Sequence, residues 1–116
     1  METTRKHLRF ICNGSADLTD GANGRVWGHL GDVSLGGFYL STFGPWAVGT
    51  EVCFKLMIDN KEICGTGIVA TSHPGVGMAI AYKEVPPEYK AKLQDVIRGL
   101  ESSTPPEDEK SLGIKV

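Results

Sequence analysis

The chain has 116 residues and a formal net charge of −2, with 41% hydrophobic and 22% charged residues. This size and composition predict one globular domain with a modest core. Residues 1–100 hold ten acidic and ten basic side chains, so the chain lacks the broad basic surface of a general nucleic-acid binder. It also has no run near the roughly 20 apolar residues of a membrane span and no apolar signal segment, so we expect a cytoplasmic protein with no membrane insertion.

Short apolar runs divided by glycine-rich turns make up most of the chain. Thirteen of the 15 glycines precede residue 78, which favours a β-rich body. Residues 13–24 are rich in Gly, Asp, Thr and Ser and are expected to form a loop or an irregular hairpin. Alternating or short apolar runs predict strands at 8–12, 25–33, 38–42, 52–58, 63–71 and 76–80. Turns are expected at 34–37, 59–60 and 72–75.

The hydrophobic period changes after Pro86 and Pro87. One apolar stripe then follows the spacing of an amphipathic helix, formed by Tyr89, Leu93, Val96, Ile97 and Leu100. Six or seven antiparallel strands followed by this helix predict a small β-barrel with the helix over an opening or an edge. The expected organisation is an arm (1–9), a barrel with its C-terminal helix (10–101) and a disordered polar tail (102–116).

Cysteine and histidine patterns indicate no metal centre and no catalytic site. Cys12, Cys53 and Cys64 are odd in number and lack C-x-x-C spacing, so they are expected to be reduced, buried thiols. His29 and His73 show no ligand spacing with the cysteines. No nucleophile and base stand out together, so we expect a protein that is not an enzyme and carries no metal or cofactor.

The first candidate binding motif is R-x-x-x-R, formed by Arg5 and Arg9. A guanidinium can fork onto phosphate oxygens or onto guanine O6 and N7, and it can stack on a base. Lys6 and His7 lie between the two arginines and are further candidates for ligand contact. The alternative is a basic arm that is simply solvated.

The second candidate motif is D-x-S-x-x-G, formed by Asp32, Ser34 and Gly37, with Gly36 beside it. A carboxylate can accept hydrogen bonds from the N1–H and N2–H₂ of guanine, and a serine can donate or accept next to it. The two glycines permit a positive φ and leave room for a ligand. The alternative is that Asp32 and Ser34 only organise a turn.

The two motifs together resemble the PilZ domain family, from about Arg5 to Leu100. The similarity lies in R-x-x-x-R, a strand, D-x-S-x-x-G, a barrel-like run and a terminal helix, and in the local sequences RKHLRF, DVSLGGFYLST and GVGMAIAY. The resemblance implies a six-stranded antiparallel β-barrel with one C-terminal α-helix. It also implies binding of cyclic di-GMP, a bacterial second messenger with two guanines and two phosphates.

Carried onto this sequence, the resemblance gives each motif residue a role. Arg5 and Arg9 would hold phosphates and guanine faces, Asp32 and Ser34 would read a guanine edge, and Gly37 would make room for it. Many family members have a long residue directly before the first motif arginine, where this chain has Thr4. The ligand could therefore be one molecule or a stacked pair.

The resemblance also implies how such a receptor would act. Binding would close the arm over the barrel and signal to a separate protein partner, with the receptor a monomer or a homodimer. Motility, pilus function, exopolysaccharide or biofilm production and virulence are all processes that the family serves. A PilZ-like adaptor that binds proteins and no nucleotide is the main alternative. A small-barrel RNA or DNA binder is weaker, because it would need stacking aromatics in a basic groove.

Overall fold

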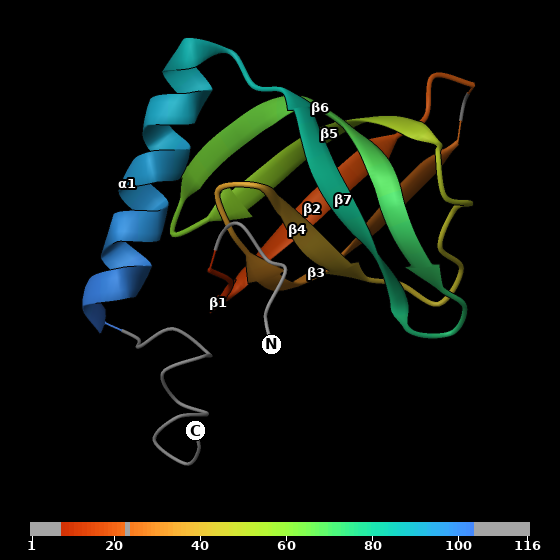
Figure 1. The fold of residues 1–116 in the computed structure, drawn as a ribbon, viewed down its shortest axis with the longest axis horizontal. Helices are drawn as coiled ribbons and strands as arrows, with labels where there is room; N and C mark the ends of the chain where they lie inside the picture. The colour runs from red at the N-terminus through yellow and green to blue at the C-terminus, as the bar shows by residue number, and fades with distance from the viewer. Residues whose placement is uncertain (1–7, 23, 104–116) are drawn as a thin grey trace, which may run out of the picture.

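The computed structural model describes residues 8–22 and 24–103, which form seven antiparallel strands and one helix (Figure 1). In chain order these are β1 (Phe10–Ile11), β2 (Gly14–Thr19), β3 (Arg25–Val33), β4 (Gly37–Ser41), β5 (Glu51–Ile58), β6 (Lys61–His73), β7 (Gly77–Glu84) and α1 (Pro87–Ser103). The predicted tail began at residue 102, whereas α1 continues to Ser103. Residues 104–116 lie outside the described part.

Six of the strands close into a barrel. The hydrogen-bonded order is β1-β3-β2-β5-β6-β7-β4, and an additional pairing of β4 with β3 completes the ring. β1 is the extra strand, and it continues the line of β2 along β3, with Phe10 opposite Val33. The predicted six-stranded antiparallel barrel with one C-terminal helix is therefore confirmed.

The core follows the period of two that the sequence shows. Along β5 every second side chain is buried, from Val52 to Ile58, and the side chains between them face solvent. Removing these side chains from water is the main stabilising contribution to a domain of this size. The same alternation leaves Cys53 exposed on the outer face, so the prediction of a buried thiol was wrong there.

The helix α1 packs along one side of the barrel, mainly against β6 and also against β1 (Figure 1). Its predicted stripe is confirmed, because Leu93, Val96 and Ile97 are buried and Tyr89 and Leu100 pack against the core. Within residues 8–22 and 24–103, no helix has the length and apolar character needed to cross a membrane.

One strand was not predicted. β2 lies in the segment expected to be a loop or irregular hairpin, and it pairs with both β3 and β5. Its inward side chains are the buried Ala16 and Leu18, but its outward ones are the polar Ser15, Asp17 and Thr19. Two small or medium apolar residues give a weak alternation, so pairing with two neighbouring strands decides the conformation.

The predicted turn at residues 59–60 is confirmed between β5 and β6. Asp59 and Asn60 have φ values of 52° and 64°, as a two-residue type I′ turn requires at both positions. Asp and Asn tolerate this left-handed region better than most other residues. A turn before β7 is also present, with Gly75 at a φ of 79°, but it spans residues 74–76 because β6 continues to His73, beyond the predicted start at residue 72.

Truncating the buried face of β5 should test this arrangement. We expect Leu56→Ala to lower the free energy of unfolding by about 2–5 kcal/mol, because it leaves a cavity in the core. Met57→Ala is the matched control on the outer face of the same strand, with an expected change of less than about 1 kcal/mol. Urea unfolding of both variants measures the difference, and equal losses would contradict the assigned faces.

Candidate ligand-binding site

A β-bulge at the end of β3 sets the direction of the Asp32 side chain. Leu30 pairs with Leu40 and Asp32 pairs with Tyr39, so Gly31 is an extra residue on β3. With strict alternation from the buried Leu30, Asp32 would point into the core. The extra residue shifts the alternation, so that Asp32 lies on the outer face and its neighbour Val33 is buried.

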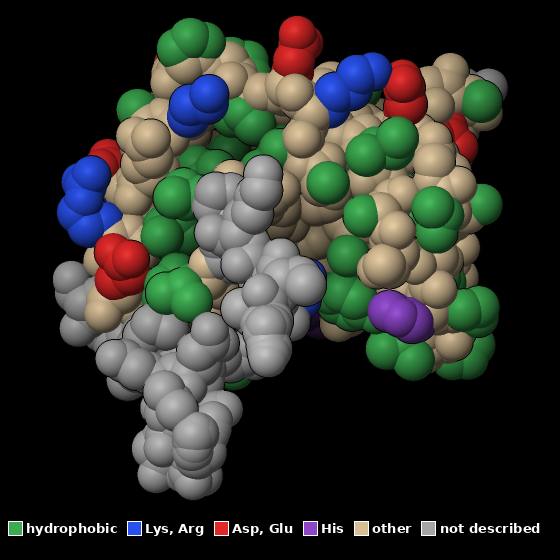
Figure 2. Space-filling model, in the orientation of Figure 1, with side chains coloured by type: hydrophobic (Ala, Val, Ile, Leu, Met, Phe, Trp, Pro, Cys, Tyr) green, Lys and Arg blue, Asp and Glu red, His purple; other side chains and the backbone are tan. Residues whose placement is uncertain are grey.

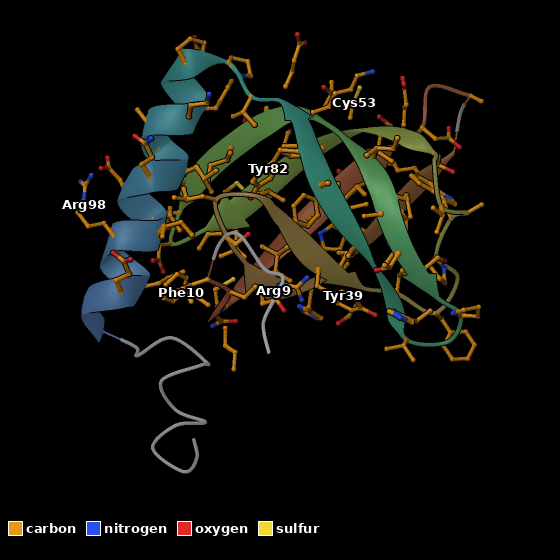
Figure 3. The ribbon with its side chains drawn as sticks, viewed as in Figure 1. Arg9, Phe10, Tyr39, Cys53, Tyr82 and Arg98 are labelled. Carbon is orange, nitrogen blue, oxygen red and sulfur yellow. The ribbon has the colours of Figure 1, made fainter. Side chains whose placement is uncertain are left out.

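Arg9 lies beside this carboxylate. Its Nη1 is 3.7 Å from Asp32 Oδ2, and the two side chains are 33% and 19% exposed. The register explains the contact, because Asp32 is opposite Ile11 and Arg9 is two residues before Ile11, on the same face. Phe10, buried in the core, fixes the backbone next to Arg9 (Figure 3). The outer face therefore carries a cation and an anion side by side.

Ser34 holds the turn that follows. Its backbone N–H donates to the carbonyl of Gly37 at 2.8 Å. Its hydroxyl accepts from the N–H groups of Gly36 and Gly37 at 3.0 and 3.1 Å, and it lies 3.2 Å from the Gly37 carbonyl, to which it can donate. Ser34 is only 6% exposed. The turn-organising role considered for Ser34 is thus present, whereas contact with a guanine stays a prediction.

Tyr82 ties this turn to β7. Its hydroxyl donates to the Ser34 carbonyl at 3.0 Å, and its backbone N–H donates to the Gly36 carbonyl at 3.1 Å. Burial, with a smaller effect of Cys12, raises the pKa of Tyr82 well above its usual value. The hydroxyl therefore stays protonated and can donate at all ordinary pH values. Two hydrogen bonds therefore hold the β3–β4 turn against β7.

Gly37 is explained by packing against β7. A Cβ at this position would overlap the carbonyl oxygen of Ile80. Gly36 and Gly37 permit a positive φ but do not use it, since the left-handed glycines of the described residues are Gly21, Gly49 and Gly75. The close approach of β7 takes its place, and room for a guanine at Gly37 stays a prediction.

Tyr39 and His73 adjoin the site, although neither was predicted to belong to it. Tyr39 lies opposite Asp32 in the register and is half-buried, and its hydroxyl is 3.2 Å from His73 Nδ1. Figure 3 shows Arg9 and Tyr39 along the same side of the barrel. The outward direction of the Tyr39 side chain could have been predicted from the sequence, because Tyr39 alternates with the buried Phe38 and Leu40 along β4.

The predicted site residues are thus brought together as far as the structure describes them. Arg9 and Asp32 form the ion pair, and the loop residues 34–37 lie directly after it. Arg5, Lys6 and His7 lie outside the described residues. No group of three or more His, Cys, Asp or Glu side chains in the described residues is placed to hold a metal ion.

The Asp32 charge also reaches a neighbouring thiol. Burial is the main cause that raises the pKa of Cys12, and the negative charges of Asp32 and then Asp59 add to it, bringing the pKa to about 11. Cys12 follows β1 and is half-buried. Its thiol can therefore report the local electrostatic potential of the site.

Comparison with known proteins identifies the class to which this barrel belongs. The sequence matches the PilZ domain family over residues 3–99. That range includes both motifs, the whole barrel and most of α1. The chain therefore belongs to the PilZ domain family.

Solved structures share the fold at low sequence identity. The PilZ domain of YcgR from Escherichia coli with c-di-GMP has a TM-score of 0.71 and 18% identity, over 98% of this chain and 100% of that one. YcgR from the same organism in complex with c-di-GMP has a TM-score of 0.75 and 16% identity, over 97% of this chain and 51% of that one. The Bacillus subtilis inhibitor of motility MotI/DgrA has a TM-score of 0.67 and 15% identity, over 84% of this chain and 51% of that one. The chain spans about half the length of the last two.

A search of curated proteins finds no match to the chain. The solved structures are all under 20% identical to it, so they establish the barrel and not the ligand.

Substitution at Gly37 tests its packing role. We expect Gly37→Ala to lower the free energy of unfolding by about 1–3 kcal/mol, since the new methyl group forces β4 and β7 apart. Gly44→Ala is the matched control, because no atom lies within 4 Å of its Cβ position and its φ is not left-handed; its change should stay within about 0.5 kcal/mol. Chemical denaturation compares them, and an unaltered Gly37→Ala midpoint would refute the close approach.

The Cys12 thiol tests the electrostatics. Asp32→Asn removes a charge that raises the pKa of Cys12, so at pH 9 more thiolate forms and alkylation by iodoacetamide should be faster. Cys64 is the internal control, because Asp32 is not among the causes that shift its pKa. Peptide-resolved mass spectrometry follows both rates. A Cys12 rate that is unchanged or slower in the variant would show that Asp32 does not act on this thiol.

Proposed function

We propose that this chain is a cyclic di-GMP receptor that binds the nucleotide and carries out no catalysis. The observation that carries the proposal is the Arg9–Asp32 pair, with opposite charges 3.7 Å apart on the outer face of the barrel. A ligand with phosphates and guanine bases offers a partner to each charge. Few other small metabolites present both an anion and two aromatic donor edges.

Arg9 is the residue suited to the phosphate or to the Hoogsteen edge of guanine. Its guanidinium is a planar fork that donates two parallel hydrogen bonds to phosphate oxygens or to O6 and N7. At 3.7 Å its contact with Asp32 is longer than a hydrogen bond, and both side chains are partly exposed. Such pairs contribute about 0–1 kcal/mol, so turning Arg9 toward a ligand costs little.

Asp32 and Tyr39 are suited to the base. The carboxylate can accept from N1–H and N2–H₂ of a guanine, which gives a charge-assisted pair. The ring of Tyr39 on the neighbouring strand offers an aromatic face on which a base can stack. The bonds of Ser34 and Tyr82 keep the adjoining turn in place, so this turn needs little ordering before binding.

Family membership supports the same ligand. The chain belongs to the PilZ domain family, and the E. coli YcgR PilZ domain that shares its fold is described with c-di-GMP. Arg5 and Arg9 fill both arginine positions of the first motif. Asp32, Ser34 and Gly37 fill the second. A nucleotide-free adaptor would have no need for this combination.

Signalling would follow from closure of the N-terminal arm. A ligand that contacts both Arg5 and Asp32 binds the closed arrangement more tightly than the open one, and it shifts the population by that difference. The closed arm then presents a new surface to a separate protein partner. One molecule or a stacked pair could act in this way.

Calorimetric titration of the full chain with cyclic di-GMP tests the proposal. We expect heat of binding in the wild type and affinity reduced by about tenfold to a hundredfold in Arg9→Ala, because a charge-assisted hydrogen bond to the ligand is lost. The stoichiometry separates one ligand from a pair. Arg98→Ala is the matched control, since it removes the same charge from an exposed position on α1.

The outcomes separate the two candidate functions. Wild-type affinity in Arg98→Ala with weakened binding in Arg9→Ala supports the receptor. Absence of binding in the wild type would reject it in favour of the adaptor. If Arg9→Ala binds cyclic di-GMP as tightly as the wild type, the nucleotide is a ligand of this chain but the site assigned here is wrong.

A further inference from the structure

The end of the barrel away from α1 exposes several hydrophobic side chains. Phe43 and Val48 lie in the loop between β4 and β5, and Val76 lies in the turn between β6 and β7. They are 87%, 63% and 61% exposed. We call these three residues the end patch. Backbone hydrogen bonds place the Phe43 segment beside the turn that carries Val76, and exposed apolar side chains that gather on one surface are a common feature of contact sites.

Hydrogen bonds tie the loops of the end patch to each other and to the barrel. The N–H of Thr42 donates to the Val76 carbonyl at 3.2 Å, and the N–H of Gly75 donates to the Phe43 carbonyl at 2.9 Å. The β4–β5 loop is also tied to the barrel, because Trp46 packs against the core and its backbone N–H donates to Met78 Sδ at 3.4 Å. These bonds hold the backbone that carries Phe43 and Val76 at the end of the barrel.

The end patch carries no formal charge. Residues 42–50 and 72–78 contain no Asp, Glu, Lys or Arg, and His73 is their one titratable side chain. Figure 2 shows the same property, with green side chains over the β6–β7 turn at the lower right and red and blue ones along the upper edge and over α1. A partner for this surface needs no charges of its own.

We propose that the end patch is the contact surface for a second copy of this chain, in a symmetric dimer. In a two-fold contact the same surface faces itself, so any charge near the axis would meet a like charge. A neutral patch with an aromatic anchor avoids this repulsion, and charge depletion with aromatic enrichment is typical of interface centres. Phe43 of each subunit would then be removed from water.

A second exposed aromatic side chain, Trp27, is less suited to a two-fold contact than the end patch. Trp27 is also 58% exposed, on the outer wall of β3. It lies opposite Asp17, whose carboxylate pairs with Arg25, and Lys55 is the next residue in that row. A two-fold contact there would bring these charges against their own copies. Trp27 thus serves as an exposed hydrophobic control outside the end patch.

Sedimentation equilibrium of the full chain without nucleotide tests the proposal, from micromolar to millimolar concentration. We expect a monomer–dimer equilibrium whose dissociation constant rises at least about tenfold in Phe43→Asp, because each dimer gains two unpaired charges. Val76→Asp should act in the same direction. Trp27→Asp adds the same charge elsewhere and should leave the constant unchanged, and circular dichroism checks that all three variants are folded.

Added salt gives a second readout. A contact without ion pairs should be insensitive to sodium chloride, whereas one made by charges weakens as salt screens them. A chain that stays monomeric at millimolar concentration overturns the proposal. A dimer that Phe43→Asp and Val76→Asp leave intact, or that salt dissociates, also overturns it. Since no nucleotide is present, these results do not depend on the cyclic di-GMP proposal.

Discussion

The candidate site depends on one extra residue in β3. Gly31 shifts the alternation of the strand, and without that shift the carboxylate of Asp32 would enter a core made of aliphatic and aromatic side chains. A buried, unpaired carboxylate is costly and would be driven to its neutral form. The bulge instead places the charge outside and buries Val33 in its place. Bulges commonly re-aim side chains in this way beside functional sites.

The residues around Asp32 divide into those that hold the backbone and those that present chemistry. Phe10 and Val33 pair across β1 and β3 with both side chains in the core. Ser34 and Tyr82 satisfy the backbone groups of the following turn. Arg9 and Asp32 are thereby left on the outer face, on backbone that their neighbours hold in place, which is the arrangement that precise binding requires.

Much of the fold could be predicted from the sequence, and most of what was missed has one physical cause. Strands such as β5 and the stripe of α1 bury large apolar residues at a regular period, so their pattern is visible in one dimension. β2 buries only Ala16 and Leu18, and the pairing partners that make it a strand lie far along the chain. For the site, Arg9 and Asp32 were predicted as ligand-binding residues from their chemistry and spacing. Their contact, and the position of Tyr39 beside them, depend on the pairing register of the strands, which cannot be derived from the sequence.

A chain of contacts runs from the candidate site to the end patch. Asp32 lies opposite Tyr39, the Tyr39 hydroxyl is 3.2 Å from His73 Nδ1, and the His73 carbonyl accepts the N–H of Val76 in the patch. A base stacked on the ring of Tyr39 would change the surroundings of the Tyr39 hydroxyl and so its hydrogen bond to His73. His73 also accepts a backbone hydrogen bond from Val76, so the change would reach the turn that carries Val76. Coupling requires that the turn have two arrangements of different dimer affinity. If it has, thermodynamic reciprocity makes dimerisation and nucleotide binding change each other by the same factor.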